Sequence, residues 1–417
     1  MLLLTTGLAA EPAAEARKAI EALYARADRA CEKWDVDGVY RDCRGDYIFT
    51  STSGDRRNLE ALRKRRREAA GKLDKVRASS RIVGFQMSGS RATVQVRSHF
   101  EAEYKDWMPG RPSKFRSEEL DQDLWVRGPK GWQSVTSDGL WVSHQAGAKT
   151  TERRAGYVRL VREDGHPTAM EVAIATFVAP GGLTVDLVGA VHMAEKDYYK
   201  QLNREFTGYQ AVLYELIAPH EGERLIPQAG DETDNPLSAT QVYLTNLLGF
   251  TFQLSEVDYR PSNFVHADLS PEELLNSMTK RGESAKTMVA QLLHESLKNS
   301  TDVDPADAMA LNYSMASIMV RGATPRDRLI LRRVLASSFK QVEKMTAALS
   351  GPHGSTLIQV RNQAALAVMK REVKRGRKRL AIFYGAAHLP DLETRLLKQG
   401  FTKQGMRYLK AWDLRKP

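Results

Sequence analysis

Two short segments determine the fold that this sequence predicts for its larger part. Residues 186–193 read Asp-Leu-Val-Gly-Ala-Val-His-Met, and residues 382–389 read Ile-Phe-Tyr-Gly-Ala-Ala-His-Leu. Each is an apolar stretch that ends in Gly-Ala-x-His and is followed, at similar spacing, by a helical pattern and a phenylalanine. Near-continuous apolar strands are buried on both faces, which favours a parallel or mixed sheet covered by helices.

The ends of these strands carry the candidate site. Ligand sites in such sheets lie at the carboxyl ends of strands, where Gly189 and Gly385 allow close approach of backbone or ligand. His192 and His388 follow, and Glu215 ends a third apolar stretch in the same manner. Two imidazoles and a carboxylate suit a divalent metal that keeps a position open for water. Two structural histidines are the alternative, because a single Gly-x-x-His is a weak signal.

These elements resemble the TraB/GumN/Tiki superfamily, with Arg361-Asn362 in a helix before the second histidine. The resemblance covers residues 155–417 and implies a mixed α/β sheet domain with a large helical insertion at about residues 238–350. It also implies a metal-dependent hydrolase or peptidase, an activity of only some branches, acting on a peptide or small molecule. Manganese, cobalt or zinc would suit His192, Glu215 and His388.

Arg361 has two interpretations. Its guanidinium could bind a substrate carboxylate or stabilise an oxyanion, or it could form an ion pair that orients Glu215. Both roles require the side chain near the site. Asn362 is a further candidate in the same helix.

A polar loop at residues 258–268 precedes a helix start at Ser270–Glu273. Within it, His266 and Asp268 are candidates for a further ligand or for proton transfer; the alternative for Asp268 is a capping role. Glu195 falls on the first turn of the helix after the first histidine, where a glutamate is common because of the helix dipole.

The first third of the chain has a different pattern. Residues 14–142 begin with helical periodicity and continue with alternating strands, which is an α+β order. The hairpin at residues 123–133 resembles the last hairpin of the SnoaL-like, nuclear-transport-factor-2-like family, whose fold is an α+β cone. Asp46 and His99 do not form a convincing pair, so a non-catalytic role in ligand binding or homodimerisation is favoured. Residues 143–154 are small and polar and predict a linker.

Charge and hydropathy restrict the partners. The net charge is +11, from 62 basic and 51 acidic residues. Most of the excess lies in two runs, residues 63–67 and 370–379, which are typical of solvated helix faces; no nucleic-acid-binding motif is present. No stretch approaches the ~18 apolar residues of a membrane helix.

The N-terminus leaves the compartment open. Residues 1–13 resemble the end of a secretory signal without its basic region, which favours a periplasmic or secreted protein; a plain apolar tail on a cytoplasmic protein is the alternative. In an exported protein Cys31 and Cys43 could form a disulfide; two free thiols are equally compatible with the sequence.

The competing function is a non-catalytic binding or regulatory protein. The same crevice could hold haem, a peptide signal or a small molecule without turnover, and composition does not distinguish this from the hydrolase.

Overall fold

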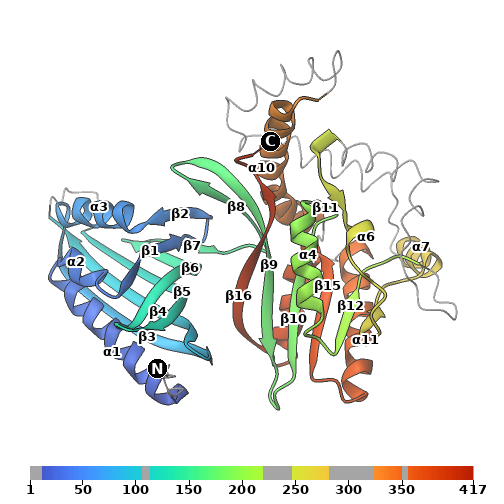
Figure 1. Ribbon diagram of the computed structural model, residues 1–417, viewed down its shortest axis with the longest axis horizontal. Coiled ribbons are helices and arrows are strands. Elements are labelled where there is room, and N and C mark those ends of the chain that lie inside the picture. The colour runs from blue at the N-terminus through green and yellow to red at the C-terminus, as the bar shows by residue number, and fades with distance from the viewer. Residues whose placement is uncertain (1–11, 106–112, 219–246, 281–322, 350–355, 417) are drawn as a thin grey trace, which may run out of the picture. The chain divides into compact units, whose positions relative to one another are not determined.

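The computed structural model describes residues 12–105, 113–218, 247–280, 323–349 and 356–416, and its contacts divide the chain into two compact units (Figure 1). Unit 1 comprises Met1–Ala155 and Arg162–Gly165, and unit 2 comprises Gly156–Val161 and His166–Pro417. The chain is α+β, with long strands and several helices. Most of the signal-like segment, residues 1–11, lies outside the described residues.

Unit 1 contains three helices and seven strands within its described part. They are α1 (Ala13–Glu32), α2 (Val36–Val39), β1 (Cys43–Thr50), β2 (Asp55–Asn58), α3 (Leu59–Ala70), β3 (Leu73–Ser88), β4 (Arg91–Tyr104), β5 (Lys114–Gly128), β6 (Gly131–Ala146) and β7 (Lys149–Arg154).

The sheet of unit 1 is mostly antiparallel. Its strand order is β2-β1-β6-β5-β4-β3, with β7 also paired to β6, and β1 runs parallel to β6. Side chains alternate between the two faces of a strand, and Ile82, Val94 and Trp125 form a buried core with Ala16 and Ile20 of α1. Helix α1 therefore covers one face of this sheet.

The linker predicted at residues 143–154 is wrong. These residues form the end of β6 and all of β7, joined by a tight turn in which Gly147 has a φ of 63°. The turn needs a residue that tolerates positive φ, which glycine supplies. Every residue of β7 is exposed, so the strand needs no apolar alternation and its composition resembles a linker. The first unit accordingly extends past residue 142.

Unit 2 begins with a strand hairpin and continues as alternating strands and helices. Its described elements are β8 (Val158–Glu163), β9 (His166–Val178), β10 (Thr184–Ala190), β11 (Met193–Ala194), α4 (Lys196–Phe206), β12 (Ala211–Tyr214), β13 (Thr251–Phe252), α6 (Gln253–Glu256), β14 (Phe264–His266), α7 (Pro271–Lys280), α10 (Pro325–Leu349), the π-helical turn η2 (Thr356–Val360), α11 (Arg361–Lys374), β15 (Arg379–Gly385), the 3-10 turn η3 (Ala386–His388), α12 (Leu389–Lys398) and β16 (Thr402–Asp413).

The sheet of unit 2 is mixed, as the apolar strands predict. Its order is β14-β12-β15-β10-β9, with β16 also paired to β9. β14, β12, β15 and β10 are mutually parallel, whereas β9 runs antiparallel to β10. The two repeated segments supply β10 and β15, which are direct neighbours in the sheet.

Helices cover both faces of these parallel strands. Tyr199 and Phe206 of α4 belong to one core with Val188 of β10 and Phe383 of β15. α4 lies along the sheet in Figure 1. On the other side, α11 contacts β12 and α12 contacts β10. Burial on both faces explains why these strands read as continuous apolar runs.

The helical insertion predicted at about residues 238–350 is corrected in its described part. Residues 251–252 and 264–266 are strands, and β14 joins the main sheet beside β12. The insertion is therefore interrupted by sheet. The helix start at Ser270 is confirmed: the Ser270 hydroxyl accepts from Glu273 N at 3.1 Å, and Glu273 accepts from Ser270 N at 2.8 Å, a reciprocal capping box.

Two further observations concern the whole described chain. Cys31 and Cys43 are both free thiols. Among the described helices, none combines the length and the apolar character that crossing a membrane requires.

Candidate functional site

Four parallel strands bring the candidate residues to one edge of the unit 2 sheet. Ala190 of β10 is level with Gly385 of β15, and Tyr214 of β12 is level with Phe383 of β15 and His266 of β14. Because parallel strands end at the same edge, the residues that follow them share that edge.

Glu215 lies at the centre of the candidate site. Its Oε2 accepts the Gly385 backbone N–H at 2.5 Å, and its Oε1 lies 2.7 Å from Nη2 of Arg361. Burial alone would raise the pKa of Glu215, but His388, Arg361 and His192 together with the Gly385 N–H hold that pKa at about 2. The carboxylate is thus ionised at every physiological pH.

Arg361 bridges two carboxylates. Its Nε and Nη2 donate to Asp268 at 2.9 and 2.5 Å, and the same Nη2 reaches Glu215. Arg361 is 8% exposed and Asp268 is 3% exposed. Burial would lower the pKa of Arg361, but the hydrogen bonds from Asp268 and the two carboxylate charges raise it above its ordinary value. The guanidinium is therefore permanently charged and held in a fixed plane.

His388 is oriented by the residue that follows Arg361. The Asn362 side-chain amide donates to His388 O at 3.2 Å and to Asp391 at 2.7 Å, which turns Asn362 Oδ1 toward His388 Nδ1 at 2.7 Å. An amide oxygen only accepts, so Nδ1 of His388 carries a proton and donates it to Asn362. Nε2 lies 3.6 Å from Glu215 Oε1, beyond hydrogen-bond distance. Burial lowers the pKa of His388, despite the opposing charge of Glu215.

His192 lies at the end of β10 but is exposed. Its ring stacks on Phe252 with 6.4 Å between centroids, and its carbonyl accepts from Gln253 N. Its charge contributes to the lowered pKa of Glu215, so it lies within electrostatic range of that carboxylate. Among the described residues, no group of three or more His, Cys, Asp or Glu is arranged to hold a metal ion.

The two remaining sequence candidates contact backbone groups. His266 Nε2 lies 2.5 Å from Leu216 O, which connects β14 to the residues just after β12. Glu195 accepts from Asp413 N at 2.9 Å and lies 3.9 Å from Arg332. These side-chain contacts of Glu195 are with β16 and α10, not with the residues around Glu215.

The two strand-end glycines are required for different reasons. A Cβ on Gly189 would lie 2.6 Å from Cγ1 of Val172 in β9. A Cβ on Gly385 would lie 3.2 Å from Oε2 of Glu215. Gly189 therefore permits sheet packing, whereas Gly385 permits the carboxylate to reach the backbone.

Tyr384 and Asp391 also shape this site, although neither was a candidate from the sequence. The Tyr384 hydroxyl donates to Ala267 O, and its ring meets that of His388 edge-on at 5.2 Å between centroids. Burial, followed by the charges of Asp268 and Glu215, raises the pKa of Tyr384. A tyrosine directly before the glycine of the second motif was the available signal.

Unit 1 contains a buried polar network that a search for His–Asp pairs could not find. The Tyr24 hydroxyl donates to Asp123 at 2.6 Å and accepts from Trp125 Nε1 at 2.9 Å. Burial raises the pKa of Asp123 to about 6, against the hydrogen bonds from Tyr24 and Ser137, which lower it.

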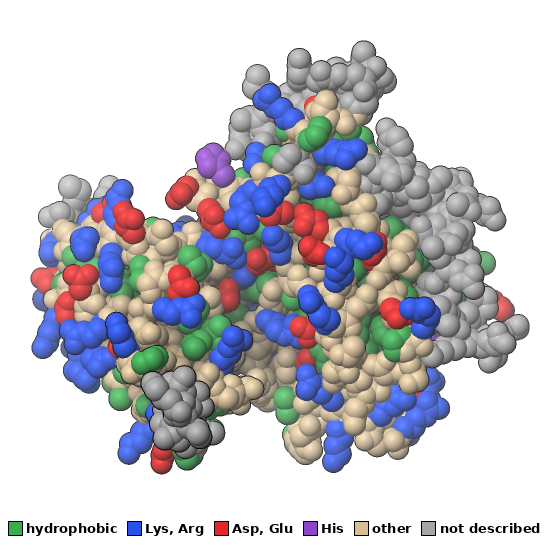
Figure 2. All heavy atoms as spheres, in the orientation of Figure 1, with side chains coloured by type: hydrophobic (Ala, Val, Ile, Leu, Met, Phe, Trp, Pro, Cys, Tyr) green, Lys and Arg blue, Asp and Glu red, His purple; other side chains and the backbone are tan. Residues whose placement is uncertain are grey.

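Surface charge is mixed on the visible face. Figure 2 shows Lys and Arg interspersed with Asp and Glu over both units. The basic run at residues 370–379 includes Arg375 and Arg377, which pair with the buried Glu372. These arginines therefore have intramolecular partners.

Comparison with known proteins yields only distant structural matches. No family model matches the chain, and no curated protein matches it. A conserved protein from Planctomyces limnophilus aligns at 14% identity and a TM-score of 0.29, over 32% of this chain and 99% of its own. A hexachlorocyclohexane dehydrochlorinase aligns at 11% identity and a TM-score of 0.28, over 32% of this chain and 91% of its own. A ketosteroid isomerase-like protein from Erwinia carotovora atroseptica aligns at 15% identity and a TM-score of 0.25, over 29% of this chain and 91% of its own. At these values the matches carry no conclusion about this chain's activity.

Proposed function

We propose that unit 2 is a metal-dependent hydrolase of the TraB/GumN/Tiki type, acting on a peptide or another acyl bond. One observation carries the proposal: Nε2 of His388 lies 3.6 Å from Oε1 of Glu215 at neighbouring strand ends, and Asn362 Oδ1 holds Nδ1 of the same ring at 2.7 Å. A neutral imidazole beside a carboxylate is a suitable pair of donors for a divalent cation.

The atoms that these residues offer are of the kinds that bind such a cation. A metal-bound histidine usually donates its other ring N–H to a fixed acceptor, and Asn362 Oδ1 is that acceptor for His388. A carboxylate has about four lone-pair sites, so Glu215 retains capacity beyond Arg361 and Gly385. His192, exposed at the next strand end, would complete the set. When bound, manganese, cobalt or zinc would supply an acidified water as nucleophile.

The protein's own residues hold this pair in place. Arg361 is occupied by Asp268 and Glu215, so we assign it a positioning role instead of oxyanion binding. Asn362 fixes the tautomer of His388. His266 and Asp268 position the loop and the guanidinium, respectively.

The test combines metal content with hydrolysis. Purified full-length protein is loaded with Mn²⁺, Co²⁺ or Zn²⁺, and bound metal and cleavage of a peptide library are measured for wild type, His388→Ala, His192→Ala and Glu215→Gln. The exposed His166 in β9 supplies the matched control, His166→Ala. We expect metal and cleavage to be lost in the first three variants and kept in the control. Unchanged metal content in all of them would overturn the proposal.

The rival is a binding protein that uses the same edge of the sheet. The exposure of His192 and the absence of a three-ligand group among the described residues favour it. Binding of haem or a peptide without turnover and without metal would support this rival.

For unit 1 we infer a SnoaL-like domain with a role in ligand binding or homodimerisation. The support is a long helix, α1, packed on one face of a mostly antiparallel sheet. Sedimentation of the isolated unit at several concentrations tests the dimer.

A further inference from the structure

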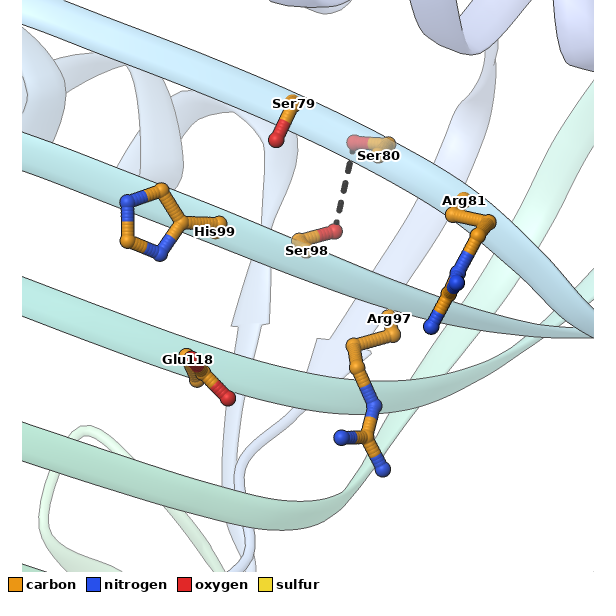
Figure 3. A pocket seen from close by; sticks show the side chains of 7 residues that line it. All are labelled: Ser79, Ser80, Arg81, Arg97, Ser98, His99 and Glu118. Atoms are coloured by element: carbon orange, nitrogen blue, oxygen red, sulfur yellow. Dashed lines mark hydrogen bonds between the residues drawn. The ribbon is translucent and has the colours of Figure 1, made fainter.

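A hollow of about 390 Å³ lies on the unit 1 sheet, on strands β3, β4 and β5 (Figure 3). Its lining combines two guanidinium groups, an imidazole, a carboxylate and three serines, of which Ser80 donates its hydroxyl to Asp28 of α1. The lining residues are Ser79, Ser80, Ser98, Arg81, Arg97, His99 and Glu118. The volume is in the range of small-molecule sites.

The strand register explains why these groups meet. Arg81 lies directly opposite Arg97, and His99 lies opposite both Ser79 and Glu118. Directly opposed residues share one face of a sheet, as do residues two apart on a strand. Their neighbours Ile82 and Val96 are buried, so the charged row lies on the face opposite α1.

The two arginines form an unbalanced pair. Like charges directly opposite each other in a sheet repel, and Figure 3 shows the two arginine side chains extending from neighbouring strands. Within the described residues neither Arg81 nor Arg97 has an ion-pair partner, whereas Arg116, elsewhere on the same sheet, pairs with Glu101 at 2.9 Å. An anion between the two guanidinium groups would remove the repulsion.

A further donor adjoins this pair. The guanidinium carbon of Arg97 lies 5.8 Å from the centroid of the Trp141 ring on β6. The indole Nε1 of Trp141 is buried and has no hydrogen-bond partner among the described residues. A buried N–H without an acceptor is uncommon in folded proteins, and this one lies beside Arg97.

The opposite end of the hollow is acidic. Glu118 is exposed and has no ion-pair partner within the described ranges. It lies one strand over and two residues along from the arginine row, so about 6–7 Å separates the two rows along the strand direction. The hollow thus presents positive charge at one end and negative charge at the other.

We propose that this hollow binds a small zwitterion, with its carboxylate or phosphate between Arg81 and Arg97 and its ammonium group at Glu118. Arginine forks match both oxyanions, so the charge pattern defines the ligand class and does not choose between them. Ser79 and His99 supply further hydrogen bonds between the two ends. The site belongs to unit 1 and is independent of the function proposed for unit 2.

Calorimetric titration of the full chain tests the proposal with matched probes. γ-Aminobutyrate and butyrate form the carboxylate pair, and phosphoethanolamine and ethyl phosphate form the phosphate pair. All titrations use the same ionic strength, set with chloride. The variants are Arg81→Gln/Arg97→Gln and Glu118→Gln. Arg91→Gln is the control, because Arg91 is an exposed arginine of β4 outside the hollow.

We expect at least one zwitterion to bind more tightly than its amine-free partner; the pair in which it does so identifies the oxyanion. The double arginine variant should weaken binding at least tenfold and, without ligand, melt no lower than wild type, because repulsion is removed. Glu118→Gln should abolish the preference for the amine, and Arg91→Gln should change nothing. Absence of binding by all four probes, equal binding of zwitterion and amine-free partner in both pairs, or full binding by the double variant would each overturn the proposal.

Discussion

At the level of single residues, one guanidinium compensates two buried carboxylates. Arg361 joins Glu215, which follows β12, to Asp268, which follows β14. A charge buried without its partner is strongly destabilising, whereas an exposed ion pair contributes little. The stability lost when an arginine of this chain is replaced therefore depends on whether a buried carboxylate loses its counter-charge.

Arg361→Met should lower the free energy of unfolding of unit 2 by about 3–5 kcal/mol, because two buried carboxylates lose their counter-charge. Arg375→Met is the control: Arg375 is exposed, and its buried partner Glu372 retains Arg377 at 3.1 Å. A loss of less than about 1 kcal/mol is expected there. Urea unfolding measures both, and equal losses would contradict the argument.

Asp123 should make the stability of unit 1 depend on pH. Its pKa of about 6 in the folded protein exceeds its ordinary value of 3.8, so the folded state binds the proton more tightly. The resulting stabilisation is present below pH 3.8 and is lost as pH rises to about 6, by about 3 kcal/mol. Asp123→Asn, which keeps an acceptor for Tyr24, should reduce this slope by that amount; burial also raises the pKa of the neighbouring Asp121, which contributes a slope of the same sign. Urea unfolding between pH 4 and pH 7 tests it; a slope in Asp123→Asn equal to that of wild type would assign the effect elsewhere.

At the level of elements, the glycine of the repeated strand–histidine unit has a different role in each of the two copies. Gly189 packs against β9, and Gly385 admits Glu215 to the backbone of β15. The same four-residue pattern thus supports sheet packing at one strand end and carboxylate binding at the other.

Gly189→Ala should cost about 1–3 kcal/mol, as overpacking does in a dense core. The new Cβ would lie 2.6 Å from Val172 Cγ1. Gly45→Ala in β1 is the matched control, because nothing lies within 4 Å of its added Cβ; a change within about 0.5 kcal/mol is expected. Adding Val172→Ala to Gly189→Ala should recover part of the loss. Additive effects in this double-mutant cycle would count against the packing explanation.

The sequence predicted a strand or helix correctly wherever its hydrophobic pattern reflects which side chains are buried. The apolar runs before Gly189 and Gly385 predicted two buried strands of a parallel or mixed sheet, because burial on both faces leaves a continuous apolar pattern; that the two strands are direct neighbours comes from the structure. The capping box at Ser270 was predictable because it is a local contact. The linker assignment failed because an exposed strand such as β7 has no burial pattern. The Arg361–Asp268 pair joins residues far apart in sequence, and no local pattern encodes such a contact.

At the level of the whole molecule, each unit has its own buried core. Unit 1 packs α1 on its sheet, and unit 2 packs α4 against β10 and β15. The recognisable motifs lie in unit 2, whereas the hollow with Arg81 and Arg97 lies in unit 1. Separate cores indicate that the two parts can be studied separately.

A fragment of residues 12–155 should fold alone, because it contains the whole core around Ile82, Val94 and Trp125. Circular dichroism and urea unfolding should show one cooperative transition. A fragment of residues 12–130 lacks β6, which pairs with β1, β5 and β7, and should remain unfolded. An unfolded 12–155 fragment would mean that unit 1 depends on the remainder of the chain.

The position of β15 between β10 and β12 has a consequence for biosynthesis. β10 and β12 leave the ribosome well over a hundred residues before the strand that separates them. Until β15 emerges, two apolar strands have unpaired edges, which are templates for pairing with other chains. The nascent chain must also avoid joining β10 directly to β12. Late insertion of a central strand is a long-range step, and such steps are slow. Production of this protein should therefore depend on chaperones that cover the unpaired edges of β10 and β12 until β15 is made.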